Sequence, residues 1–209
     1  MRKFKISLAS LFLALGIISC NNQESTNSNE AEEKVCKYVY KADDTKIGFG
    51  AFKFTEKVEV KGGFEDFKIE NTVASENPNE VFANAEFTVY VKSLETNDEG
   101  RNIKIREHFF GTMLNTDEMK GYVTKIENDS IYIDFKMNEL TKSVALSYSL
   151  DDKNINLEGT INVLDWSANE ALAAINKACE DLHKGEDGIS KTWADVNLYI
   201  STTLAEDCK

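Results

Sequence analysis

The sequence predicts an all-β fold: an eight-stranded antiparallel barrel with a C-terminal helix and a short helical cover segment. Within residues 131–163, apolar and polar residues alternate strictly over three successive segments. Side chains on a strand project to opposite faces with a period of two, so each segment has one apolar and one polar face. Five more segments elsewhere in the chain show strand patterns, which brings the count to eight.

The three alternating segments predict a β-meander. Short breaks that are rich in turn formers separate or bound these segments, at residues 127–129, 138–139 and 151–153. Such breaks favour antiparallel hairpins over helical crossovers. An antiparallel sheet with one apolar face has to bury that face, so the function depends on what lies against it.

The other strand segments are residues 47–54, 58–69, 87–91, 121–126 and 196–200. The apolar phase changes within residues 58–69, beside two glycines and an acidic pair, which predicts a bulge or sharp bend. Eight antiparallel strands can close into a barrel that holds side chains or one slender ligand. A two-sheet sandwich would show the same alternation, so the pattern leaves both arrangements open.

Two segments are predicted to be helical. Ser167 and Glu170 have the spacing of a capping box, and Gly185 is a stop signal. Between them, one helical stripe would lie on the barrel: Leu172, Ile175, Cys179 and Leu182. Residues 93–113 are too many for a hairpin connection, and we expect a short helix there that covers one end of the barrel.

The N-terminal region predicts export and lipidation. Arg2, Lys3 and Lys5 precede an apolar run over residues 6–18, which is typical of a bacterial secretory signal. Cys20 at the junction indicates a lipobox, whereas an ordinary signal peptide would carry this cysteine by chance. The polar residues 20–33 predict a flexible tether. We therefore expect a signal peptide (1–19), a lipidated tether (20–33), a barrel domain (34–204) and a tail (205–209), held at the bacterial cell envelope on the periplasmic side or the cell surface.

The charge balance argues against two classes of partner. The chain has 24 basic and 36 acidic residues, a net charge of −12. Removal of residues 1–19 takes away three basic residues and leaves 21 against 36, a net charge of −15. Such a surface repels nucleic-acid phosphates and anionic lipid headgroups. Solubility is the simplest role for this charge.

Three cysteines remain after export: Cys36, Cys179 and Cys208. An oxidising compartment favours one disulfide and one free thiol. We expect Cys36 to pair with Cys179, because Cys208 lies in the terminal tail, where little would fix its geometry. The sequence has no Cys-x-x-Cys pair, which argues against redox catalysis and against a structural zinc site.

An ordered set of short motifs carries a family resemblance. The motifs are Ser93-Leu94-Glu95-Thr96-Asn97, Gly100-Arg101, Phe109-Phe110, Leu140-Thr141-Lys142, Asp181-Leu182-His183-Lys184-Gly185 and Lys191-Thr192-Trp193. In these residues the chain resembles the YceI-like family of exported lipid-binding proteins, in a lipoprotein version. The resemblance implies a lipocalin-like barrel whose lumen can hold a polyisoprenoid or similar long amphiphile. The family commonly has an acid after the arginine; here Asn102 replaces it, so we expect no Arg-Asp ion pair in this loop.

An apolar lumen needs a mostly apolar lining. The sequence predicts that the following residues supply it: Phe49, Phe87, Val89, Ile131, Ile133, Phe135, Val144, Leu146, Tyr148, Ile155, Leu157, Ile161, Val196, Leu198 and Ile200. Four glycines on these strands are expected to leave space inside, namely Gly48, Gly50, Gly62 and Gly159. The alternative is that the apolar side chains fill the barrel themselves, which would make the protein a structural or interaction module.

Candidate headgroup contacts are Arg101, His108 and Lys191, which we place at the mouth of the barrel. The sequence shows no nucleophile elbow, phosphate-binding glycine loop or zinc-protease motif. An enzyme that acts on a bound lipid is the least favoured alternative, because it would need an inward titratable residue and Tyr148 is the only obvious candidate in the meander. We therefore expect no catalytic residues, no cofactor and no metal. The predicted function is to bind and sequester or carry a polyisoprenoid-like lipid.

Overall fold

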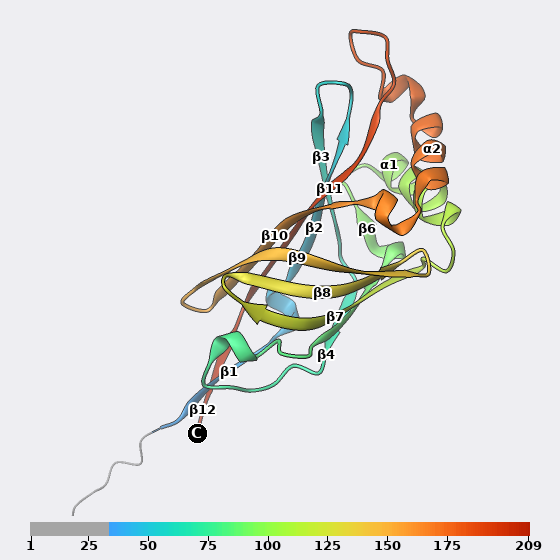
Figure 1. The fold of residues 1–209 in the computed structure, drawn as a ribbon. Helices are drawn as coiled ribbons and strands as arrows, with labels where there is room; N and C mark the ends of the chain where they lie inside the picture. Colours follow the sequence, from blue (N-terminus) through green and yellow to red (C-terminus); the bar gives the residue numbers. More distant parts are fainter. Residues whose placement is uncertain (1–33) are drawn as a thin grey trace, which may run out of the picture. The chain divides into compact units, whose positions relative to one another are not determined.

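The main part of the fold is an antiparallel sheet of ten strands, which a computed structural model describes within residues 34–209 (Figure 1). Its strands are β2 (Lys46–Lys53), β3 (Val58–Phe64), β4 (Phe67–Glu70), β5 (Glu86–Tyr90), β6 (Leu94–Glu95), β7 (Glu118–Glu127), β8 (Ser130–Met137), β9 (Leu140–Asp151), β10 (Asn154–Asn162) and β11 (Thr192–Thr203). The predicted signal peptide, the tether and the lipidation site Cys20 lie outside the described residues.

The strand order is β4-β5-β7-β8-β9-β10-β11-β2-β3-β6, and the sheet curls into a half-barrel (Figure 1). This confirms the all-β class, but it corrects the predicted closed barrel to a half-barrel with β4 and β6 at its edges, and the predicted count of eight strands to ten. The predicted bend is real: Glu65 and Asp66 separate β3 from β4. Because β3 pairs with β2 while β4 pairs with β5, the bent segment reaches two distant places in the strand order. The two-residue strand β6 adds the tenth strand.

The predicted meander is present as β8, β9 and β10. Ile133 lies opposite Val144, and Tyr148 lies opposite Leu157, so apolar residues share one face across the three strands. The hairpin between β8 and β9 turns at residues 138–139, which both have positive φ angles of 49° and 60°. Two consecutive positive φ values match the right-handed twist of paired strands, so this turn fixes their register.

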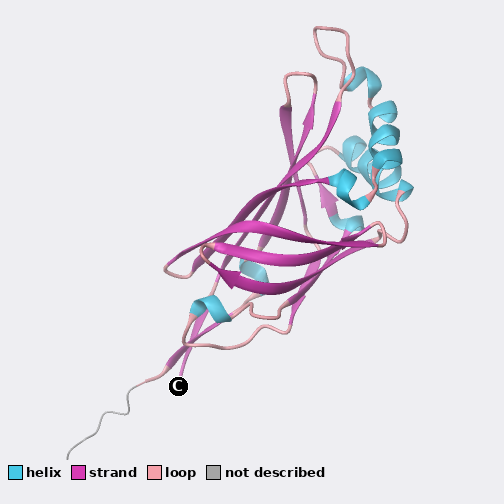
Figure 2. Ribbon diagram, in the orientation of Figure 1, coloured by secondary structure: helices cyan, strands magenta, loops and turns pink. Residues whose placement is uncertain are grey.

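Both predicted helices form and lie beside each other at one end of the sheet (Figure 2). The cover segment contains α1 (Glu99–Lys104), which continues as helical turns to Thr112. The C-terminal helix is α2 (Asn169–Ala178). The predicted capping box is wrong: Ser167 adopts a left-handed φ of 56° and ends the preceding 3-10 turn, and Ala168 takes the N-cap position.

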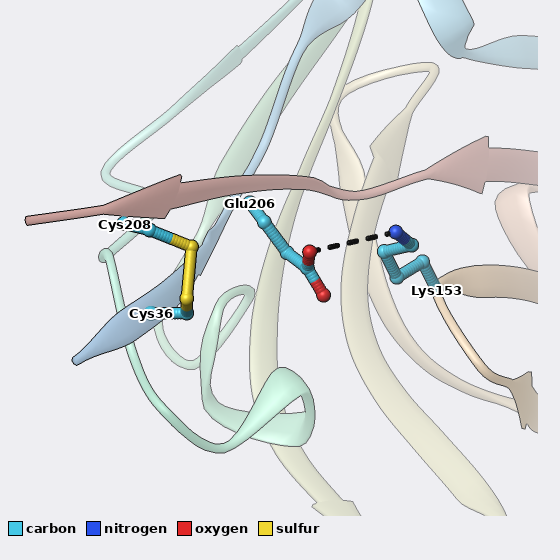
Figure 3. The surroundings of a disulfide bond; sticks show 4 residues. All are labelled: Cys36, Lys153, Glu206 and Cys208. Atoms are coloured by element: carbon cyan, nitrogen blue, oxygen red, sulfur yellow. Dashed lines mark ion pairs between the residues drawn. A yellow bond between two sulfur atoms is a disulfide. The ribbon is translucent and has the colours of Figure 1, made fainter. Parts of the chain in front are cut away.

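The two ends of the domain form a separate ribbon of β1 (Cys36–Val39) and β12 (Ala205–Cys208). A disulfide joins Cys36 to Cys208, with a Cα–Cα distance of 4.0 Å (Figure 3). Nearby, Lys153 Nζ lies 3.7 Å from a Glu206 carboxylate oxygen. The predicted pairing of Cys36 with Cys179 and the predicted loose tail at residues 205–209 are therefore wrong. Antiparallel pairing of the two ends brings Cys36 directly opposite Cys208, while Cys179 is a buried free thiol.

Candidate functional site

The inner face of the curled sheet surrounds a cavity of about 470 Å³. This volume lies in the range of small-molecule binding pockets, roughly 300–1,000 Å³. The following predicted residues all line the cavity: Phe49, Phe87, Val89, Ile131, Ile133, Phe135, Val144, Leu146, Tyr148, Ile155, Leu157, Ile161, Val196, Leu198 and Ile200. The period-two alternation therefore located the cavity wall, and the role of these residues as ligand contacts stays a prediction.

The central strand β11 shows that the cavity is not filled by side chains. Val196, Leu198 and Ile200 lie in the middle of the strand order and point to the apolar face, yet each is only partly buried. In a close-packed interior, apolar residues at such positions would be almost fully covered. Their remaining exposed surface faces the hollow.

The glycines do not create this hollow by leaving empty space. A side chain at Gly62 or Gly159 would collide with Phe49 or Leu146, which already occupy those positions. At Gly50, it would meet the Glu59 carboxylate, and at Gly48 it would contact the Tyr199 backbone. The predicted reason for the space is therefore wrong. At Gly62 and Gly159 an apolar side chain lies against the glycine and so stays close to the wall.

The helices close one end of the cavity. All four residues of the predicted apolar stripe, on α2 and the helical turn after it, line the cavity: Leu172, Ile175, Cys179 and Leu182. Among these, Ile175 and Cys179 are buried, whereas Leu182 is 59% exposed. Leu182 thus lies where the apolar lining meets solvent, at the helix end of the cavity.

Asn102 holds the cover segment in place, a role the sequence did not reveal. This side chain is 1% exposed. Its Oδ1 accepts hydrogen bonds from the backbone N–H (2.9 Å) and hydroxyl (2.6 Å) of Thr96, and its Nδ2 donates to Glu95 (3.2 Å) and Glu99 (3.3 Å). A buried amide with its partners satisfied fixes local geometry. Asn102 therefore fixes the geometry of the cover segment.

The three candidate headgroup contacts separate in the structure. Arg101 lines the cavity, while His108 and Lys191 are exposed and do not. Arg101 donates a hydrogen bond to the Thr96 carbonyl (3.3 Å) and lies 3.5 Å from an Asp98 carboxylate oxygen. An Arg-Asp pair therefore does exist in this loop, on the N-terminal side of the arginine, contrary to our expectation.

Sequence reasoning missed polar residues that also line the cavity, among them Lys53, Asp98, Lys104 and His183. Lys53 could have been found, because it continues the inward alternation of Ile47, Phe49 and Ala51. The ring of His183 is partly buried, and its Nδ1 lies 2.7 Å from the Thr192 hydroxyl. Burial lowers the pKa of His183, and the positive charges of Lys53, Lys104 and Arg101 lower it further.

Tyr148 carries a buried hydroxyl that has no hydrogen-bond partner within residues 34–209. Its surroundings are apolar, and its pKa is raised by burial. An unsatisfied buried polar group costs about 1–3 kcal/mol. We therefore expect Tyr148→Phe to raise the free energy of unfolding by about 1 kcal/mol in urea denaturation of the ligand-free protein.

The control for this prediction is Tyr132→Phe, which removes a hydroxyl from the neighbouring strand at a position that does not line the cavity. The pH dependence adds a second test. Burial raises the folded-state pKa of Tyr148 above 10.0, so the folded state disfavours the phenolate. The free energy of unfolding of wild type should therefore not change through this group below pH 10.0, and should fall as the pH rises through the folded-state pKa. Tyr148→Phe should lack this alkaline loss. A drop in stability at neutral pH would contradict the prediction.

The described part of the chain holds no cluster of three or more His, Cys, Asp or Glu residues suited to a metal ion. Within residues 34–209, no helix reaches the length and apolar character of a membrane span.

A curled antiparallel sheet around an apolar hollow, with helices over one end, defines a class of β-proteins with an internal cavity. More specifically, the chain belongs to the YceI-like domain family, whose model matches residues 38–203. That match covers most of the chain and agrees with the resemblance seen in the sequence motifs. No curated protein matches the chain in a sequence search.

Several solved structures share this fold at low sequence identity. A polyisoprenoid-binding domain from Saccharophagus degradans, implicated in plant cell wall breakdown, has a TM-score of 0.54 and 11% identity over 82% of this chain and 99% of that one. BcnA from Burkholderia cenocepacia has a TM-score of 0.51 and 12% identity, covering 79% and 99%. A YCEI protein from Campylobacter jejuni has a TM-score of 0.50 and 17% identity, covering 73% and 86%.

Proposed function

We propose that this domain binds the apolar chain of a polyisoprenoid-like lipid in its cavity and sequesters or carries it. The observation that carries the proposal is the hollow interior, where apolar residues of central strands keep exposed surface toward a cavity of about 470 Å³. A hollow apolar wall is unfavourable in water and is stabilised when an apolar chain covers it. The Saccharophagus degradans domain, a polyisoprenoid binder of the same fold, supports this choice of ligand class.

The mechanism is transfer of an apolar tail from membrane or water into the cavity, without covalent chemistry. Burial of apolar surface contributes about 25 cal/mol per Å². The tail would lie along the aromatic and aliphatic wall, and the polar head would stay at the helix end, where Arg101 lines the cavity and Leu182 is exposed. Removal of the tail from water is the whole driving force for the chain part of the ligand.

The location we propose is the bacterial cell envelope. The basic start, apolar run and Cys20 of the N-terminal sequence support export and lipid attachment, and the polar residues 20–33 would tether the domain to its membrane. The net charge of −15 after processing disfavours electrostatic docking on anionic lipid, so the anchor would supply the membrane attachment.

The test is whether a lipid co-purifies with the protein and leaves when the cavity is blocked. Val144 lines the cavity, while the next residue, Ala145, is exposed on the other face of β9. Val144→Trp would fill part of the hollow, and Ala145→Trp adds the same ring outside. Mass spectrometry after mild isolation should detect a bound lipid in wild type and in Ala145→Trp, and at least tenfold less in Val144→Trp.

Two results would overturn the proposal. One is a lipid-free spectrum for wild-type protein that also fails to take up added C20 isoprenoid alcohol. The other is equal lipid loading of Val144→Trp and Ala145→Trp, since it would place the lipid outside the cavity. Circular dichroism and thermal unfolding of both variants check that each one folds.

A further inference from the structure

Two loops are joined to each other at the helix end of the cavity. One is the turn between β2 and β3 with its flanking residues, 52–58, and the other leads into β11, residues 182–193. The Thr55 hydroxyl of the first loop donates a hydrogen bond of 2.6 Å to the Asp187 carboxylate of the second. Both loops lie at the end of the domain opposite the ribbon of β1 and β12 (Figure 1). We call residues 52–58 and 182–193 the mouth rim.

The mouth rim exposes large apolar side chains. Val58 is 45% exposed and Ile189 is 54% exposed, and Leu182 is exposed to a similar extent. Leu182 also lines the cavity, so the apolar lining continues onto the rim. Val58 lies two residues before Val60, which lines the cavity, so both point to the same face of β3. Exposed apolar surface of this kind indicates contact with a protein or a membrane.

Trp193 lies on the rim between two lysine side chains. Lys57 Nζ and Lys191 Nζ lie 5.0 Å and 4.9 Å from the centroid of its ring. Tryptophan is enriched at the interface between bilayer and water, and lysine there extends its charged end to the water. Lysine is depleted from protein–protein interfaces. The combination therefore favours a membrane over a protein as the partner of the rim.

The charge of the mouth rim differs from that of the rest of the chain. The rim has four basic and three acidic residues, whereas the chain from residue 20 onward has 21 basic and 36 acidic residues. Anionic headgroups repel the rest of the chain, while the rim is close to neutral. A bilayer of zwitterionic phospholipid is therefore the membrane surface that the rim fits best.

On the basis of the proposed function, we propose that the mouth rim docks on a zwitterionic lipid bilayer. Val58, Leu182 and Ile189 contact the apolar part of the bilayer, and Trp193 lies near the headgroups. The tail of the ligand then passes between bilayer and cavity without crossing water. Because exposure of an apolar tail to water is unfavourable, docking speeds loading and release.

The first measurement uses Trp193 as a reporter of contact with lipid. The chain has two tryptophans, and the other one, Trp166, is buried. The protein is the chain from residue 20 onward with Cys20→Ser, so that no attached lipid contributes. Phosphatidylcholine vesicles with brominated acyl chains should quench its fluorescence relative to unbrominated vesicles, and Trp193→Phe should show no difference. Equal fluorescence with both vesicles, or quenching that persists in Trp193→Phe, would overturn the docking.

The second measurement compares two pairs of substitutions by vesicle sedimentation. Val58→Ser with Ile189→Ser removes apolar surface from the rim at positions outside the cavity lining. The matched control is Val35→Ser with Val73→Ser, whose side chains are 48% and 46% exposed and also lie outside the lining and the rim. The rim pair should lower partition into phosphatidylcholine vesicles at least tenfold, and the control pair should not. Circular dichroism checks that both pairs fold. Equal partition of the two pairs would overturn the docking.

Anionic lipid tests the role of charge. Phosphatidylglycerol added to the vesicles should weaken binding, because the chain outside the rim is acidic. Stronger binding to these vesicles would show that charge and not the apolar rim attracts the protein, and would overturn the docking on neutral lipid.

The rate of loading separates docking from ligand binding. Uptake of the C20 isoprenoid alcohol from phosphatidylcholine vesicles should be at least tenfold slower in the rim pair than in the control pair, while the amount bound at equilibrium should be the same. An equal rate in both pairs would overturn the docking and leave the proposed function standing. Failure of the unlipidated chain to take up the alcohol at all would overturn the proposed function itself, whether or not Trp193 is quenched.

Discussion

Replacement of Cys36 and Cys208 by serine together should lower the free energy of unfolding by about 4 kcal/mol. The disulfide joins residues 172 positions apart. The chain-entropy relation gives about 5 kcal/mol for a loop of this length, and measured values are usually somewhat smaller. A two-stranded ribbon is marginal by itself in water, so β1 and β12 should also separate without the cross-link. Urea denaturation of wild type and variant measures the loss.

Reduction of the wild-type protein is the control for the disulfide variant. Dithiothreitol should bring wild type to the stability of the double variant and leave the double variant unchanged. Thiol labelling of the unfolded, unreduced protein should modify the peptide containing Cys179, which is the free buried thiol, and spare those containing Cys36 and Cys208. Labelling at Cys208 together with protection of Cys179 would restore the pairing that the sequence suggested.

Trp166→Ala should lower the free energy of unfolding by about 3–5 kcal/mol. The side chain is 1% exposed and packs edge-on against Phe135 with ring centroids 5.5 Å apart. Its indole N–H donates a hydrogen bond to the Phe135 carbonyl at 3.0 Å, and its own carbonyl accepts one from Asn138 at 2.8 Å. Loss of the ring would leave a cavity where the meander meets the turn that leads into α2.

Trp193→Ala is the matched comparison for Trp166→Ala. Trp193 is also a tryptophan beside the helix end, and its indole donates to the Phe54 carbonyl at 2.7 Å, but it is only partly buried. Its loss should therefore cost less in urea denaturation. An equal or larger cost for Trp193→Ala would show that the core around Trp166 repacks, and would contradict the importance of this contact.

Local alternation predicted the cavity wall because inward and outward positions differ by one residue along a strand. Ile131, Leu146 and Leu157 were placed correctly because each lies in an uninterrupted strand. The strand count was wrong for two reasons: the phase change near Gly62 was read as a bend within one strand, which the structure divides in two, and the two-residue strand β6 was not predicted. Periodicity reports which way side chains point and does not report where pairing partners change.

The long-range features could not be predicted in this way. The Cys36–Cys208 bond depends on the pairing of two chain ends, and no local pattern shows which ends meet. Asn102 looked like a lost ion pair, because a sequence cannot show that an amide is buried and makes four hydrogen bonds to three neighbouring residues. Lys53 was partly predictable, because it follows the inward alternation of β2, but its place in the same cavity lining as Arg101 and Lys104 of α1 depends on how the sheet curls.

The cross-linked ribbon also determines how the domain would respond to a mechanical pull at residue 34. Along the sequence, β1 is followed by β2, and β11 is followed directly by β12. The strands β2 and β11 are neighbours in the sheet. The Cys36–Cys208 bond therefore distributes a pull at residue 34 over both strands together. The two strands would then move in the same direction, so tension would not peel β2 away from β11 one residue at a time.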